Sequence, residues 1–153
     1  MKIRVKISDC DGYTSCAVFI NYLHRLFPAN VENNFVYVHH ERKAHGILID
    51  KIPDGTKLVV SLDAGSSEYK IHKELAARGI DILCLDHHHA TQASEYACVI
   101  NNQLCDYPNK SLCGVGVVYK FCSYIDSLMG TNYADDYLDL VALGETADVM
   151  DLR

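Results

Sequence analysis

Apolar residues recur along the chain with two spacings, one typical of β-strands and the other of α-helices. Short runs that are continuously apolar, or that alternate with polar residues, predict strands, and longer stretches with apolar residues every three or four positions predict helices. Glycine or proline follows three of the predicted helices, as expected where a helix ends. The predicted strands are residues 3–8, 35–39, 58–62, 80–85 and 97–100, and the predicted helices are residues 13–27, 67–78, 115–129 and one that begins at Tyr137.

Strands and helices alternate along the sequence, which is typical of a parallel sheet whose strands are joined by helices. We therefore predict a doubly wound α/β fold, with a mainly parallel sheet and helices on both faces. The sequence has no internal repeat, low-complexity segment or linker, so the prediction is a single domain over residues 1–153.

Cellular location is predicted from what the sequence lacks. No apolar run approaches the ~20 residues needed to cross a bilayer, and the first residues lack the apolar core and cleavage site of a signal peptide. The seven cysteines form no Cys-x-x-Cys pair and most lie in apolar segments, so we expect reduced, mostly buried thiols rather than disulfides or a zinc site. These features predict a cytoplasmic protein.

The formal net charge of the chain is −6. A domain that grips long nucleic acid through its phosphates usually carries a basic surface. The acidic balance therefore argues against tight binding to long strands, unless part of the negative charge consists of metal ligands that a bound cation neutralises.

Acidic and histidine residues follow three of the predicted strands, at the places where an open α/β sheet binds its ligands. Each group alone is explained as well by a turn, a helix cap or a solvated surface. Their recurrence favours one shared crevice, in which carboxylates repel one another unless cations bind. Oxygen ligands with an occasional imidazole suit Mn²⁺ or Mg²⁺ better than a structural zinc. The residues are Asp9 and Asp11 after the first strand, Asp63 after the third, Asp86 to His89 after the fourth, and Asp148 in the last helix.

The order of these motifs resembles the DHH phosphoesterase superfamily, and within it the catalytic domain of RecJ-like single-stranded-DNA-specific exonucleases. The motifs are DxDG at residues 9–12, an aspartate after a later strand, DHH at residues 86–88, a glycine-rich stretch, and ALGxxAD at residues 142–148. The resemblance runs from about Lys6 to Leu152. It implies metal-assisted hydrolysis of phosphodiester bonds in nucleic acid.

The resemblance also implies two bound Mn²⁺ or Mg²⁺ ions, and it assigns a role to each residue of the motifs. Asp9 is expected to bind the first ion and Asp11 the second, with Asp63 bridging them. His87 and Asp148 are expected to complete the second ion's ligands. His88 is expected to contact the scissile phosphate and Asp86 to orient its neighbours, whereas His89 has no expected role.

Further residues are candidates for contact with substrate. Gly114 and Gly116 lie in the glycine-rich stretch SLCGVG, where they either expose backbone N–H groups to a phosphate or simply permit a tight helix start. Asn101, at the end of a short strand, is a weaker candidate for the same phosphate. Arg42 and His45 are expected to line the substrate entrance.

Two features depart from the family pattern. Ile7 stands where RecJ-like proteins usually have a further aspartate or histidine, so the first metal site is expected to keep only Asp9 and Asp63 unless a group such as His45 helps. The family also normally adds a C-terminal substrate-binding domain, which predicts that this chain is an excised catalytic domain or a naturally minimal protein.

Three functions therefore stay open at the level of sequence. The first is a RecJ-like single-stranded DNA exonuclease domain. The second keeps the chemistry but acts on short oligonucleotides, dinucleotides or a nucleotide-like monoester, which suits the net charge of −6 better. The third is a non-catalytic relative that binds a nucleotide or a protein partner, for which Ile7 is the evidence.

Overall fold

The computed structural model describes residues 9–38 and 46–151 of the chain, and its strands form a three-stranded parallel sheet. The strands are β1 (Leu58–Leu62), β2 (Asp81–Asp86) and β3 (Cys98–Asn101), in that order across the sheet. Leu62 is paired with Leu85 and Leu85 with Ile100. All three strands therefore end at the same edge, which is where a parallel sheet places its ligands.

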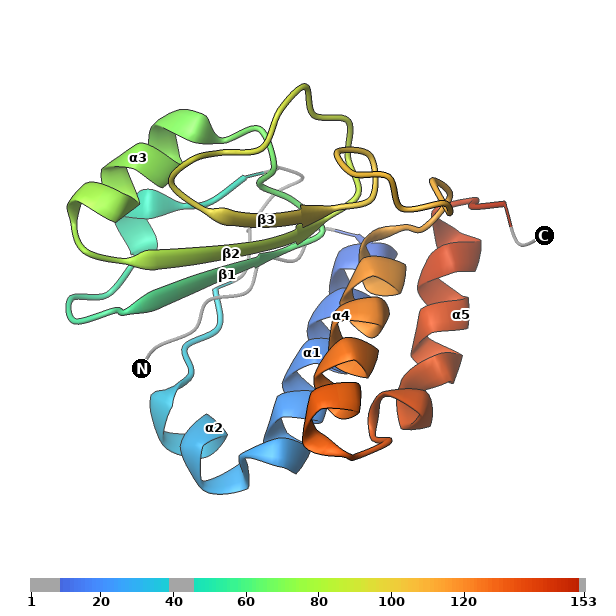
Figure 1. Ribbon diagram of the computed structural model, residues 1–153. Coiled ribbons are helices and arrows are strands. Elements are labelled where there is room, and N and C mark those ends of the chain that lie inside the picture. The colour runs from blue at the N-terminus through green and yellow to red at the C-terminus, as the bar shows by residue number, and fades with distance from the viewer. Residues whose placement is uncertain (1–8, 39–45, 152–153) are drawn as a thin grey trace.

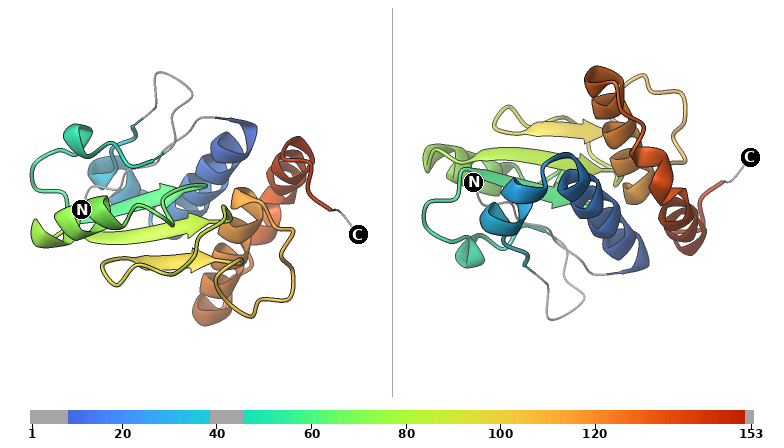
Figure 2. Two further views of the ribbon diagram at one scale, coloured as in Figure 1. Left: turned by 90° about the horizontal axis from the view of Figure 1, so that it is seen from above. Right: turned by 90° about the horizontal axis from the view of Figure 1, so that it is seen from below.

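Helices cover both faces of this sheet (Figures 1 and 2). On one side α3 (Tyr69–Ala77) packs against β2. On the other side α1 (Cys10–Leu26), α4 (Gly114–Met129) and α5 (Leu138–Ala147) pack against one another, and α4 also contacts β2. The predicted α/β fold with a parallel sheet is confirmed.

Two apolar clusters separate these layers, because successive residues of a strand point to opposite faces. Val60 and Leu62 of β1 belong to the cluster under α1 and α4. Val59 of β1 and Ile82 of β2 belong to the cluster under α3, together with Leu75 of that helix. Burial on both faces explains why β1 reads as the almost wholly apolar run LVVSL, with only Ser61 polar, rather than as an alternating pattern.

The helix boundaries show where local chemistry modified the predicted elements. Asp9 accepts a hydrogen bond from the Gly12 N–H (2.9 Å), so it caps α1, which begins at Cys10. Pro28 not only ends α1 but begins a further helix, α2 (Pro28–Asn34), because proline is tolerated in the first turn of a helix. Short 3₁₀ helices at Ile49–Lys51 and Ala134–Tyr137 complete the elements of the described ranges.

One predicted strand is wrong over the part that can be compared. Residues 35–38 are not a strand, because they pair with none of the three described strands. The predicted strand at residues 3–8 lies outside the described residues. None of the helices in residues 9–38 and 46–151 is long and apolar enough to cross a membrane.

Candidate metal centre

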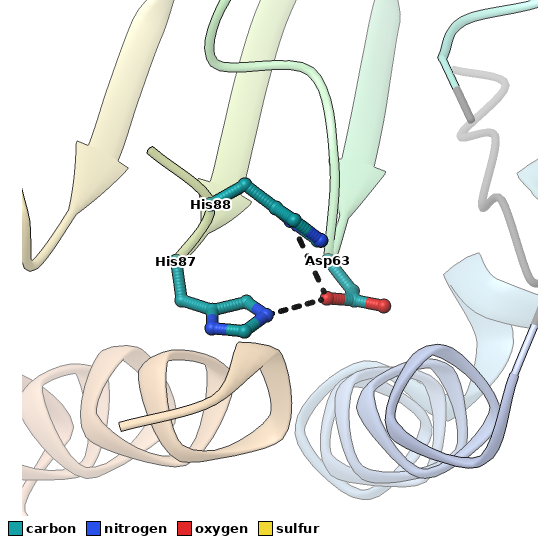
Figure 3. A group of neighbouring side chains, drawn as sticks. All are labelled: Asp63, His87 and His88. Carbon is teal, nitrogen blue, oxygen red and sulfur yellow. Dashed lines mark ion pairs between the residues drawn. The ribbon is translucent and has the colours of Figure 1, made fainter. Parts of the chain in front are cut away.

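The ends of β1 and β2 bring the first part of the site together. Asp63 directly follows β1, and its N–H donates to the carbonyl of Leu85 in β2 (2.8 Å). The Asp86-His87-His88 segment ends β2, so His87 and His88 both turn toward Asp63 (Figure 3). Asp63 Oδ1 lies 3.2 Å from His87 Nε2 and 3.9 Å from His88 Nδ1.

Two helix ends add carboxylates on the other side of His87. Asp11 lies in the first turn of α1 and Asp148 is the residue that follows α5. An oxygen of each lies 3.7 Å from His87 Nε2. Two groups of potential ligand atoms result, each within 4.8 Å of one another: Asp63 with His87 and His88, and Asp11 with His87 and Asp148. The second group contains the three residues expected around the second ion besides the bridging Asp63.

Asp63 has the features of a metal ligand. Its side chain is buried, its backbone lies in the left-handed region (φ +56°), and Oδ1 accepts no well-aligned hydrogen bond from the described residues. Burial raises the pKa of its carboxyl to about 7, and the charges of Asp11 and Asp9 act in the same direction against the opposing effect of His87. A buried acid with one oxygen that accepts no well-aligned hydrogen bond from the described residues, and that faces other acids, fits a divalent cation.

Asp86 is held in the opposite way. It accepts hydrogen bonds from the N–H groups of Ser66 (2.9 Å), His87 (2.8 Å) and His88 (3.1 Å), and from the ring Nδ1 of His88 (2.8 Å). Burial alone would raise the pKa of this carboxyl, but the bonds from His88 and Ser66 outweigh it and hold the pKa below its usual range. The bond to Asp86 in turn raises the pKa of His88 to about 9. Asp86 therefore fixes the loop that carries both histidines.

The amino end of α4 holds Asp11. One oxygen of Asp11 accepts the Gly114 N–H (2.6 Å), and the other accepts the Val115 N–H (2.8 Å) and lies 3.1 Å from Cys113 Sγ. A Cβ on Gly114 would come within 2.7 Å of Asp63 and 2.9 Å of Asp11, so a larger residue would displace both carboxylates. The anion at this helix end is thus a side chain of the protein itself. The glycine-rich stretch thus lets the start of α4 approach Asp11 closely and donate backbone N–H groups to it.

Glu145 is a residue of this site that sequence reasoning missed. It is buried on α5, its Oε2 accepts the Cys113 N–H at 3.5 Å, and its Oε1 has no hydrogen-bond partner among the described residues. Its carboxyl lies against Gly116, where an added Cβ would displace it. Burial raises the pKa of Glu145, as does the charge of Asp11. Only its place inside ALGETAD could have indicated a role, because nothing in the sequence shows that it faces inward.

The other predicted residues differ in how the structure places them. Asn101 is 3% exposed, and its Nδ2 donates to Ser66 Oγ and to the carbonyl of His88, both at 2.9 Å. It therefore supports the histidine loop, and its predicted contact with a phosphate stays a prediction. Asp9 caps α1 and belongs to neither of the two ligand groups found in the described residues. Ile7, Arg42 and His45 lie outside the described residues.

Comparison with known proteins decides the family. Residues 4–145 match the model of the DHH family, N-terminal domain. The chain belongs to this family. The match includes Asp11, Asp63 and His87, and the model's range ends shortly before Asp148.

Two relatives with similar sequences agree with this assignment. The SPbeta prophage-derived protein YorK of Bacillus subtilis is 46% identical over 154 residues, which cover 99% of this chain and 26% of YorK. The RecJ protein of Haemophilus influenzae is 31% identical over 160 residues, covering 94% of this chain and 28% of RecJ. The chain thus spans about a quarter of the length of these relatives.

Two RecJ crystal structures share the fold of this DHH-family domain. One is of exonuclease RecJ bound to manganese (TM-score 0.81, 24% identity, 97% of this chain and 39% of that chain). The other is of RecJ from Thermus thermophilus in complex with Mn²⁺ (TM-score 0.77, 23% identity, 99% of this chain and 22% of that chain).

Proposed function

We propose that this domain hydrolyses phosphodiester bonds of single-stranded DNA with the help of two divalent cations, preferably Mn²⁺. The observation that carries the proposal is the convergence of Asp11, Asp63 and Asp148 on the single imidazole of His87. The names of the relatives support it. RecJ of H. influenzae is a single-stranded-DNA-specific exonuclease, and YorK carries the name of a candidate enzyme of the same kind.

The donor set suits two hard cations rather than one soft one. Asp11, His87 and Asp148 would hold the second ion, and Asp63, whose Oδ1 lies 3.2 Å from His87 Nε2, would bridge to the first. Asp9 is the further ligand proposed for the first ion. When bound, such ions supply Lewis-acid stabilisation of phosphoryl oxygens and lower the pKa of water.

Asp86 and His88 would serve the substrate. Because His88 Nδ1 is bonded to Asp86, its Nε2 is the ring nitrogen proposed to meet a phosphoryl oxygen. With its pKa raised to about 9, the imidazole of the metal-free protein carries a proton at neutral pH and can donate to an anion. Asp86 acts through His88 by fixing the orientation of its ring. Arg42 and His45 keep their proposed place at the substrate entrance, and Asn101 its proposed place near the phosphate. The Gly114 N–H donates to Asp11 and Gly116 lies against Glu145, so these two glycines are proposed to act on the substrate only through those side chains.

Short oligonucleotides are the second candidate substrate, and the net charge of −6 favours them. A long strand is held mainly through phosphate contacts with cationic side chains. An acidic domain therefore gains less binding free energy from each added nucleotide.

All seven cysteines are free thiols. This supports the proposal that the protein works in the reducing cytoplasm.

The test is hydrolysis of a 5′-labelled single-stranded DNA and of a dinucleotide, each with Mn²⁺ and with EDTA. The controls are Asp63→Ala, which removes the bridging ligand, and Asp50→Ala, which removes an exposed acid of a 3₁₀ helix. The proposal expects Mn²⁺-dependent products from wild type and Asp50→Ala only, with the preferred length choosing between the two substrates. No product from either substrate, or equal activity of Asp63→Ala, would contradict it.

A further inference from the structure

A pocket of about 250 Å³ lies beside the metal centre, at the edge of the sheet formed by β3. The helix α4 packs against β2, and the residues that line the pocket belong to β3, to α4 and to the connection between them. Its lining is Ile100, Asn101, Asn102, Cys105, Tyr107, Leu112, Val117, Lys120, Phe121 and Tyr124.

Aromatic rings and a cation define the chemistry of this pocket. Phe121 and Tyr124 are one turn apart on α4, and Tyr107 approaches from the connection. Tyr124 is 62% exposed, so its ring is accessible to a ligand. Lys120 lies one turn before Tyr124 and is exposed. Aromatic faces for bases beside a cation for phosphates are the combination that binds single-stranded nucleic acid.

The walls of the pocket are held in place by contacts within the connection. Asn102 Nδ2 donates to the carbonyls of Asn109 (3.2 Å) and Leu112 (3.3 Å). The ammonium of Lys110 donates to the carbonyl of Asn102 (2.6 Å) and to that of Cys105. A pocket that is preorganised in this way loses little conformational entropy when a ligand binds.

Two residues of the pocket wall adjoin residues of the metal centre. Asn101 forms part of its wall and also donates to the carbonyl of His88, the residue proposed to contact the scissile phosphate. At the other end, Leu112 directly precedes Cys113 and Gly114, which contact Asp11. A strand whose phosphate lies at His88 can therefore continue past Asn101 to the aromatic rings.

We propose that this pocket binds a nucleobase of the strand whose phosphodiester lies at the metal centre. The inference rests on the proposed function and adds the residues that retain the substrate. The base stacks on Tyr124 or Tyr107, and Lys120 pairs with a neighbouring phosphate. Because every base has an aromatic face, the pocket accepts any base rather than one sequence. Stacking supplies retention that the net charge of −6 does not.

The experiment compares two fluorescent hexanucleotides, one of thymidylates and one with the same phosphates but abasic sugars. Fluorescence anisotropy in EDTA measures binding without hydrolysis. Wild type is expected to prefer the thymidylate oligomer by at least about fivefold, the contribution of one stacked base. Tyr124→Ala and Tyr107→Ala should bring the preference toward one. Lys120→Ala should weaken both oligomers alike.

Tyr96→Ala is the matched control, since Tyr96 is also exposed and has Lys73 over its ring, but it precedes β3 at the strand's other end. It should keep the wild-type preference. The inference is overturned if wild type binds both oligomers equally or neither, or if the pocket variants keep the preference, as expected if a protein surface covers these rings. A preserved preference in wild type without hydrolysis under Mn²⁺ would remove the proposed function and leave the pocket inference standing.

Discussion

Two buried aspartates end neighbouring strands of the same sheet, and they are held in opposite ways. Asp86, the last residue of β2, accepts four hydrogen bonds, and its pKa lies below the usual range. Asp63 after β1 has one oxygen without a well-aligned hydrogen bond from the described residues, and its pKa is raised to about 7. The described residues therefore provide well-aligned hydrogen-bond donors for Asp86, but not for Oδ1 of Asp63.

This difference indicates different roles: Asp86 supports the histidine loop, whereas Asp63 is suited to bind a metal ion. Hydrogen bonds to a buried carboxylate offset the cost of its desolvation, so Asp86 stabilises the loop it holds. Asp63 is desolvated, faces Asp11 and Asp9, and has a left-handed backbone. Strain of this kind persists where function requires it. The same substitution should therefore have different consequences at the two aspartates.

Replacing Asp63 by Asn should have the largest effect, in opposite directions on activity and on stability. Mn²⁺-dependent hydrolysis should fall by more than about a hundredfold, because the proposed bridging ligand is lost. The melting temperature in EDTA should rise, because a neutral side chain removes repulsion with Asp11 while asparagine still tolerates positive φ. Labelled-product assays and thermal unfolding measure the two effects. A lower melting temperature would show that Asp63 stabilises the fold.

Replacing Asp86 by Asn should instead reduce both the stability of the fold and its affinity for Mn²⁺. The amide can replace one acceptor oxygen, but its NH₂ would face an N–H donor such as that of Ser66. We expect a loss of about 1–3 kcal/mol in the free energy of unfolding and a roughly 10–100-fold weaker Mn²⁺ affinity, through the loosened histidine loop. Urea unfolding and calorimetric titration are the measurements. Unchanged stability would contradict the supporting role.

The pH dependence of metal binding should follow the raised pKa of Asp63. Its folded pKa of about 7 lies above the unfolded value, so the metal-free protein should lose stability as pH rises from about 4 to about 7. Mn²⁺ must displace the proton, so its affinity should rise by up to about tenfold per pH unit below 7. Thermal shifts with Mn²⁺ and with EDTA between pH 5.5 and 8.5 test this. Asp63→Asn should flatten the dependence, and a thermal shift independent of pH would contradict it.

The smallest expected effect concerns the other left-handed residue of the site. Val149 follows Asp148 with φ +56°, where a β-branched side chain is strained. Val149→Gly should stabilise the protein by about 0.5–1 kcal/mol, the relief of strain less the entropy of glycine. Gly130→Ala is the mirror control, since Gly130 ends α4 at φ +69° with open space around it, and should destabilise by about 1 kcal/mol. The two changes are compared by urea unfolding.

The fold and much of the site's composition could be predicted because they depend on residues that are close together in the sequence. The periodicity of apolar residues indicates each element, and the residues at the end of each strand are its immediate neighbours in the chain. The bounds of β1 were predicted to the residue, and Asp11, Asp63, His87 and Asp148 were expected near one another, as their ligand atoms are in two groups that share His87. Their roles as ligands stay predictions.

Packing between distant segments was not predictable in the same way. Asp11 meets the N–H groups of Gly114 and Val115 more than a hundred residues along the chain, so the use of the glycine-rich stretch depends on how α1 and α4 pack. Asn101 looked available to a phosphate because a strand end is usually exposed, but its side chain is used within the protein. Glu145 faces inward only because α5 packs beside the start of α4.

We propose that the carboxylates converging on His87 hold two cations, with Asp63 as the ligand shared by both. Titration of the metal-free protein with Mn²⁺, followed by calorimetry and electron paramagnetic resonance, tests this most directly. The account predicts two ions per chain with a spin-coupled spectrum, one ion without coupling in Asp11→Asn, and no coupling in Asp63→Asn. A single uncoupled ion in the wild-type protein, or a coupled pair that survives Asp63→Asn, would contradict it.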